Sequence, residues 1–310
     1  MIKLIKKLYK RFTKVSMGAL SLAAILGLLA TSSPAFAAVS VVYDAVPSPL
    51  PPNVASLGFQ ATQTSEFGDY VHLAGTDRNL TTVTVTMSDW ALFSDYSTDT
   101  RYLGNSSNWT HPITLNVYNV VPGSPNTVGS LIGTVTQTIT IPWRPVADPT
   151  CSTATAWRSP SDSLCYNGLA FNATFDLSSL NVTLPNDVIV SVAYNTQTYG
   201  TTPMVLAGPY NSLNVGVPTG QTASVGTDDS ADKVFWNSAT GTAGVFREDT
   251  GWTPNGTVNI QINASAPLVG PATSVDQCKK NGWQTFNNPT FKNQGACVSY
   301  VQANEKAGKK

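Results

Sequence analysis

The sequence is poor in the side chains that transfer protons or attack bonds. Its 310 residues include only two histidines, three glutamates and four cysteines, and charged residues make up 12% of the chain. It contains no G-x-S-x-G nucleophile motif, no H-E-x-x-H zinc motif and no phosphate-binding loop. We therefore expect a protein that is not an enzyme and that needs no organic cofactor.

Paired carboxylates leave one enzymatic alternative, because a glycoside hydrolase needs only two carboxyl groups that face one bond. The candidate pairs are Glu66 with Asp69 and Glu248 with Asp249. Neighbouring residues on a strand point to opposite faces of the sheet, which weakens the second pair. Glycoside hydrolysis is thus the least favoured of three functional hypotheses.

The first 37 residues have the organisation of a secretory signal peptide. Residues 1–14 include six basic residues, and an apolar run covers residues 15–30. Ala35 and Ala37 then supply the small side chains of a cleavage site. An uncleaved membrane anchor is the alternative, but the apolar run is shorter than the roughly 20 residues that span a bilayer. We predict cleavage after Ala37 and a secreted, extracellular location.

Removal of this segment changes the charge of the chain from neutral to acidic. The whole sequence has 18 basic and 18 acidic residues, and residues 1–37 hold six of the basic ones and none of the acidic ones. The remainder has a net charge of −6, with six lysines concentrated in residues 275–310. An acidic body does not favour nucleic-acid binding, whereas a basic tail can contact an anionic surface.

Motifs for attachment to the cell surface are missing. No lipobox cysteine follows the signal segment, and the sequence has no L-P-x-T-G motif and no second membrane-spanning segment. We expect release to the medium or loose association with the cell wall through the basic tail. Cell-wall polymers or glycans are the partners that this predicts.

The four cysteines form two local pairs, Cys151 with Cys165 and Cys278 with Cys297. Outside the cell such pairs can oxidise, and the short loops favour the sequential pairing. Zinc is the competing explanation, but it requires C-x₂-C spacing or nearby histidines, which are missing here. We predict two disulfides.

Alternation of apolar and polar residues is the strongest pattern in the body of the chain. It covers six segments: 82–87, 113–117, 135–141, 169–175, 188–194 and 258–262. Four weaker candidates are 40–44, 70–74, 213–217 and 233–237. Because helical periodicity is nearly absent, residues 38–268 are predicted to form an all-β, antiparallel β-sandwich or jelly-roll-like domain. Two smaller sandwiches are the alternative.

Residues 142–167 interrupt the strand pattern and contain Trp143, Trp157 and the first cysteine pair. Long ordered loops often carry function, so the two tryptophans are candidates for stacking on a ligand such as a sugar. The alternative is structural: the disulfide keeps the loop from fraying, and the tryptophans cover one end of the sandwich.

Small residues and prolines over residues 269–274 predict a linker, followed by a small module over residues 275–310. This module has the pattern C-K-K-N-G-W at 278–283 and F-K-N-Q-G-A-C-V-S at 291–299. It resembles the short C-terminal tails of secreted bacterial proteins, especially those of actinobacteria. We expect one disulfide and a few aromatic residues to hold a fold too small for a core of its own.

The body also resembles a family of exported bacterial proteins. The resemblance rests on residues 43–52, 64–69, 73–78, 210–215, 234–237 and 246–252. It implies a secreted β-sandwich and carries over no catalytic residues.

Calcium is the one metal that the sequence suggests. Asp228, Asp229 and Asp232 lie in one loop after Gly226, and loop carboxylates suit a hard cation outside the cell. The alternative is that these side chains are simply solvated, because the loop lacks the D-x-[DN]-x-[DN]-G pattern.

Two non-catalytic functions remain. The preferred one is a structural or adhesive surface protein that presents the loops of a stable sandwich. The alternative is a carbohydrate-binding module that uses exposed tryptophans, because flat aromatic rings suit the faces of sugars. The tryptophans considered are Trp90, Trp109, Trp143, Trp157, Trp236 and Trp252, and packing in the core is expected to claim at least half of them.

Overall fold

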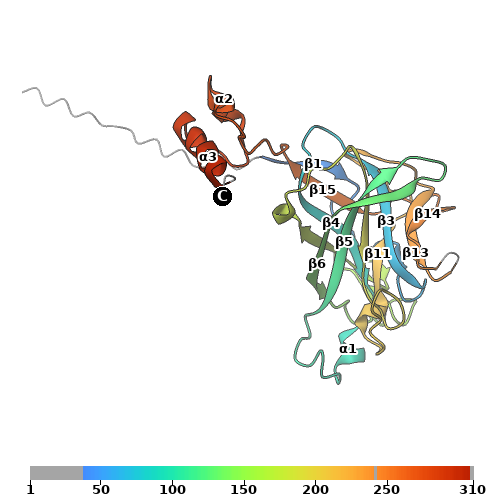
Figure 1. The fold of residues 1–310 in the computed structure, drawn as a ribbon. Helices are drawn as coiled ribbons and strands as arrows, with labels where there is room; N and C mark the ends of the chain where they lie inside the picture. The colour runs from blue at the N-terminus through green and yellow to red at the C-terminus, as the bar shows by residue number, and fades with distance from the viewer. Residues whose placement is uncertain (1–37, 241–242, 308–310) are drawn as a thin grey trace, which may run out of the picture. The chain divides into compact units, whose positions relative to one another are not determined.

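The computed structural model describes residues 38–240 and 243–307, and the predicted signal peptide lies outside this part. Two antiparallel sheets pack face to face in the body (Figure 1). One hydrophobic cluster extends from Val42 to Ala264 and lies between them. The predicted all-β sandwich is therefore confirmed.

The first sheet is built around β4, which pairs with β9 along one edge and with β15 and then β11 along the other. Strand β1 continues the sheet beyond β15, and β2 continues it beyond β11. Its strands are β1 (Val39–Asp44), β2 (Ser56–Gly58), β4 (Asn79–Asp89), β9 (Leu169–Asp176), β11 (Leu213–Gly216) and β15 (Ile260–Ser265).

The second sheet has the order β14-β13-β3-β10-β5-β6, and the short strand β12 shares the β13 edge of β3. Its strands are β3 (Thr64–His72), β5 (Asn108–Val121), β6 (Thr127–Pro142), β10 (Asp187–Ala193), β12 (Thr227–Asp228), β13 (Lys233–Ser238) and β14 (Arg247–Thr250). Short helical turns connect the strands: α1 (Phe93–Tyr96), η2 (Ser178–Leu180) and η3 (Pro209–Ser212).

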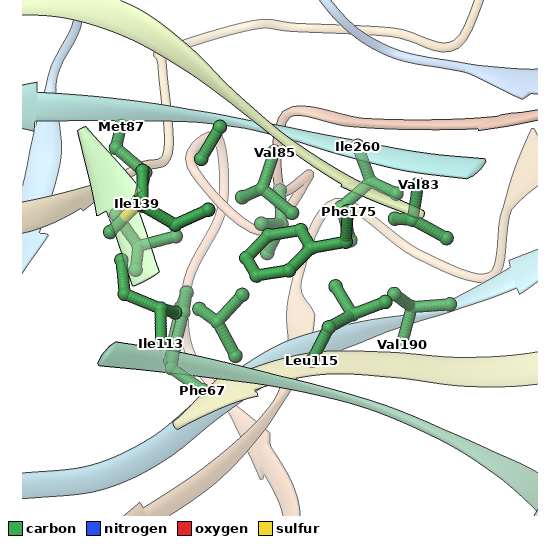
Figure 2. Close-up of a cluster of buried hydrophobic side chains, with 14 of the residues drawn as sticks. Phe67, Val83, Val85, Met87, Ile113, Leu115, Ile139, Phe175, Val190 and Ile260 are labelled. Carbon is green, nitrogen blue, oxygen red and sulfur yellow. The ribbon is translucent and has the colours of Figure 1, made fainter. Parts of the chain in front are cut away.

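The core consists of alternate side chains from the two facing sheets. Figure 2 shows Val83, Val85 and Met87 of β4 on one side of the cluster, with Ile113 and Leu115 of β5 on the other. These residues have relative exposures of 1% or less. Burial of large aliphatic and aromatic side chains at roughly 25 cal/mol per Å² of apolar surface is the main force that holds the sheets together.

Every predicted strand overlaps an observed one, including the four weaker candidates. The boundaries differ at several strands: β6 begins at Thr127 where the pattern indicated 135, and β3 runs from Thr64 to His72 where the pattern indicated 70–74. Residues 142–167 contain a small hairpin of β7 (Trp157–Arg158) and β8 (Cys165–Tyr166), closed by the Cys151–Cys165 disulfide.

The C-terminal segment has its own small core, formed by Ala272, Cys278, Cys297 and Val301. The second predicted disulfide, Cys278–Cys297, joins α2 (Val275–Cys278) to α3 (Gln294–Ala307), with η4 (Gly282–Thr285) between them. Phe291 packs edge to face against Phe286 and Tyr300. Both disulfide predictions are thus confirmed.

Candidate functional site

A groove of about 740 Å³ lies where the edge of the first sheet meets the edge of the second. Strands β2 and β11 form one side, and β13 with the turn after β14 forms the other. The residues that line it are Ala55, Ser56, Leu57, Gly58, Ala61, Thr62, Trp90, Asn211, Ser212, Asn214, Val217, Trp236, Gly251, Trp252, Thr253 and Asn255. None of these side chains carries a charge.

Three tryptophans give the groove its apolar surface. Trp90 is 42% exposed, and its indole nitrogen donates to Ser88 Oγ at 3.0 Å. Trp236 and Trp252 are half-buried and meet edge to face, with ring centroids 5.5 Å apart and an interplanar angle of 86°. Flat rings at different angles can contact different faces of one bound molecule.

Hydrogen bonds to the body fix the orientation of the second and third indoles. Trp236 donates from Nε1 to Thr64 Oγ1 at 2.7 Å, and Trp252 donates from Nε1 to Asp249 Oδ2 at 2.9 Å. The Trp252 ring also packs against the buried Phe67. Because these contacts are all within the protein, the aromatic walls are preorganised for binding.

Amide side chains supply the polar part of the groove. Asn214 donates from Nδ2 to Ser56 Oγ at 3.1 Å, across the β11–β2 pair. The Oδ1 atom of Asn255 is buried and has no hydrogen-bond donor among the described residues. A buried acceptor without a partner is rare in folded proteins.

The opening of the groove at β2 depends on Gly58. A Cβ at this position would lie 2.7 Å from Asn214 Oδ1, so the glycine lets the amide lie flat against the strand. Asn211 is held by two hydrogen bonds to Gln197, one to its backbone and one to its side chain. The polar lining therefore has a fixed arrangement on this side.

The prediction that Trp143 and Trp157 stack on a ligand is wrong. They are only 6% and 5% exposed, so neither ring presents a face to solvent. Trp143 donates to the Asn105 carbonyl, and Trp157 donates to the Gly168 carbonyl, so both indole N–H groups are satisfied inside the protein. Both rings pack inside the protein: Trp143 belongs to the main hydrophobic cluster, and Trp157 packs against Tyr166 of the β7–β8 hairpin.

Trp109 is also buried in the core. Three of the six candidate tryptophans are therefore buried, and the other three line the groove. The sequence included Trp90, Trp236 and Trp252 among the candidates but gave no reason to prefer them. Their positions depend on the pairing of strands that are far apart in the chain.

The predicted carboxylate pairs do not converge. Glu66 points to the outer face of the second sheet, where Oε1 accepts hydrogen bonds from Ser191 and Tyr118. Asp69 is 1% exposed and points into the core. The Glu248 side chain is bound by Lys233 and Asn126, and Asp249 is bound by Trp252. Neither pair can flank one glycosidic bond in this arrangement.

The three aspartates of the predicted calcium loop also have separate partners. Asp228 accepts from Thr257 Oγ1, Asp229 contacts Lys233 Nζ at 3.1 Å, and Asp232 accepts from Thr253. Within residues 38–240 and 243–307, no group of three or more His, Cys, Asp and Glu side chains is placed to hold a metal. The loop does not bring its three carboxylates together.

Comparison of the chain with protein-family models, with curated proteins and with solved structures found no match. Among the described helices, none is both long and apolar enough to cross a membrane.

Proposed function

We propose that this protein is an exported, non-catalytic binding protein whose groove holds an uncharged carbohydrate. The observation that carries the proposal is the lining: three tryptophans surrounded by amide and hydroxyl groups, with no charged side chain. Sugars combine apolar C–H faces with hydroxyl groups that donate and accept hydrogen bonds. An aromatic and amide surface matches both features.

The groove favours this function over a purely structural one. A sandwich that served only as a spacer would gain nothing from three partly exposed indoles with fixed orientations at one edge. The proposal remains compatible with adhesion, since a surface protein can attach to cells or wall polymers through their glycans.

Export is a second part of the proposal. It is supported by the basic and apolar pattern of residues 1–37 and by two disulfides, which form in oxidising compartments. Amino-terminal sequencing of protein recovered from the culture medium tests it. A first residue of Ala38 supports export with cleavage, and an intact protein confined to the cytosol contradicts it.

A glycan array followed by calorimetric titration tests the binding function. We expect binding of neutral glycans at micromolar to millimolar concentration, and a loss of at least tenfold in Trp90→Ala and in Trp252→Ala. Trp283→Ala is the matched control, because Trp283 lies in the C-terminal core outside the groove. Absence of binding to every neutral glycan at millimolar concentration would refute the proposal.

A further inference from the structure

Two carboxylates lie on the core-facing side of the second sheet: Asp69 is buried and Asp228 is half-buried. Asp69 is on β3, two residues before the fully buried Val71, so both side chains point to the same face. Asp228 on β12 is the direct cross-strand partner of Val71. The register therefore places Asp228 diagonally across from Asp69 on the inner face.

Two consecutive residues hold both carboxylates. Thr257 donates from Oγ1 to Asp228 Oδ2 at 2.5 Å, and the Val258 backbone N–H donates to Asp69 Oδ2 at 3.0 Å. The other oxygens accept backbone N–H groups of Tyr70 and Ser230. No lysine, arginine or histidine among the described residues forms a hydrogen bond or ion pair with either carboxylate.

The hydroxyl of Tyr43 faces the same region and has no hydrogen-bond partner among the described residues. Tyr43 is 0% exposed, and its ring lies against Gly226, where a Cβ would come within 3.0 Å of Cδ2. Burial first, and then the charges of Asp69 and Asp228, raise the pKa of Tyr43. A buried hydroxyl near two acids, without a partner in the part of the chain that the structure describes, is available to a ligand.

A buried carboxylate and a half-buried neighbour, neither with a basic partner among the described residues, need a positive charge or protons. Burial, and then the nearby Asp228, raise the pKa of Asp69 well above its usual value. A cavity of about 270 Å³ reaches two members of this group, Asp228 and Thr257.

We propose that Asp69 and Asp228, together with the hydroxyls of Thr257 and Tyr43, bind one divalent, oxygen-seeking cation of the calcium class. The two carboxylates balance a charge of +2, and each of their oxygens keeps a lone pair after accepting its present hydrogen bond. The site uses two carboxylates and two hydroxyls from four separate segments of the chain. It shares only Asp228 with the loop that the sequence suggested.

The bound ion would also stabilise one wall of the groove. Thr257 and Val258 directly follow the turn that carries Trp252, Thr253 and Asn255. Binding of the metal itself does not depend on what the groove holds, so it is measured with calcium alone.

Calorimetric titration of the EDTA-treated protein with calcium chloride, with thermal unfolding at 0 and 1 mM calcium, tests the site. We expect one calcium per chain and an increase in Tm of several degrees. Asp228→Asn should weaken calcium binding at least tenfold, and Asp69→Asn should do the same. Asp232→Asn is the matched control, because this carboxylate is in the same loop but is bound to Thr253; its calcium affinity should equal that of the wild type.

Three results would overturn the site. The first is a wild-type protein that takes up no calcium at millimolar concentration and whose Tm does not change. The second is Asp228→Asn with full calcium affinity. The third is an equal loss of affinity in Asp232→Asn, which would place the ion on the exposed loop. Because Asp69→Asn alters a buried group, circular dichroism must first show that it folds; the wild-type and Asp228→Asn titrations decide the question without it.

Discussion

The carboxylate of Asp89 accepts a hydrogen bond from the indole N–H of Trp109 at 3.0 Å, with both side chains buried in the core. The second oxygen of Asp89 accepts the backbone N–H of Ala91. Burial outweighs these hydrogen bonds and the charge of Arg144, and raises the pKa of Asp89 to about 7. This acid therefore keeps its proton in the folded state over a pH range in which the unfolded chain releases it.

The first prediction concerns the pH dependence that follows. Below the unfolded pKa of about 3.9, both states bind the proton, and the contribution of Asp89 is at its most favourable. As the pH rises to about 7, the folded state holds a proton that the unfolded state has lost. The contribution of Asp89 to the free energy of unfolding therefore decreases by about 4 kcal/mol. Urea unfolding of wild type and Asp89→Asn between pH 4 and 8 measures it.

We expect the free energy of unfolding of the wild type, relative to Asp89→Asn, to fall across this pH range. Asp95→Asn, which removes an exposed carboxylate on α1, should show no such trend relative to the wild type. A constant difference between wild type and Asp89→Asn at all pH values would contradict the raised pKa.

His111 gives a second prediction of opposite sign. Its Nε2–H donates to the Asn195 carbonyl at 2.8 Å, and burial lowers its pKa to about 4. The unfolded chain binds a proton at pH values below about 6.5, and the folded protein resists this until about pH 4. The contribution of neutral His111 to the free energy of unfolding is thus complete above pH 6.5. It decreases by about 3 kcal/mol as the pH falls to 4.

The variant His111→Gln tests this prediction, because a glutamine amide can donate to the same carbonyl and does not titrate. In acid unfolding monitored by tryptophan fluorescence, we expect the wild type to lose stability relative to His111→Gln between pH 6.5 and 4. Parallel stability curves for the two proteins would show that His111 does not titrate as its burial implies.

Alternation of apolar residues predicted the strands well because most of them have one face in the core and one in solvent. In β9, for example, the buried Phe171, Ala173 and Phe175 alternate with exposed residues at 172, 174 and 176, as the sequence pattern required. Five short strands of the described part were missed: β2, β7, β8, β12 and β14. Strands β2 and β14 lie at sheet edges, and the sequence R-E-D-T of β14 contains no apolar residue that could give an alternating signal.

The groove and the acid pair could not be predicted from sequence for a different reason. Trp90 and Trp252 are far apart in the chain and line one groove because β2, at an edge of the first sheet, lies beside the β13–β14 edge of the second. Asp69 and Asp228 likewise come together through the pairing of β12 with β3. Local sequence patterns identify residue types and the buried face of each strand. Contacts between distant segments depend instead on the order of the strands in each sheet.

The Cys151–Cys165 disulfide supports a third prediction. It closes a loop with a sequence separation of 14, which should stabilise the folded state by about 3 kcal/mol through the unfolded chain. We expect Cys151→Ser combined with Cys165→Ser to lower the free energy of unfolding of the sandwich by this amount in urea titrations.

The matched control is the double variant Cys278→Ser with Cys297→Ser. These cysteines belong to the separate C-terminal core, so their removal should leave the main unfolding transition of the sandwich in place. If the control lowers the main transition as much as the loop variant does, the two cores are not independent.

The last prediction uses Gly168, which lies directly beneath the Trp90 indole. A Cβ at this position would be 2.4 Å from Trp90 Nε1 and 2.4 Å from Ser88 Oγ, so Gly168→Ala must displace the ring and break the Trp90–Ser88 hydrogen bond. We expect an overpacking cost of about 1–3 kcal/mol. The Trp90 indole N–H resonance should shift in a two-dimensional NMR spectrum, and glycan affinity should fall about as much as in Trp90→Ala.

Gly133→Ala is the control: its added methyl meets only the flexible Leu180 and Val182 side chains, away from the groove. An unchanged indole resonance in Gly168→Ala would mean that the ring is not held where the structure places it, whereas a shifted resonance with full glycan affinity would remove Trp90 from the binding surface.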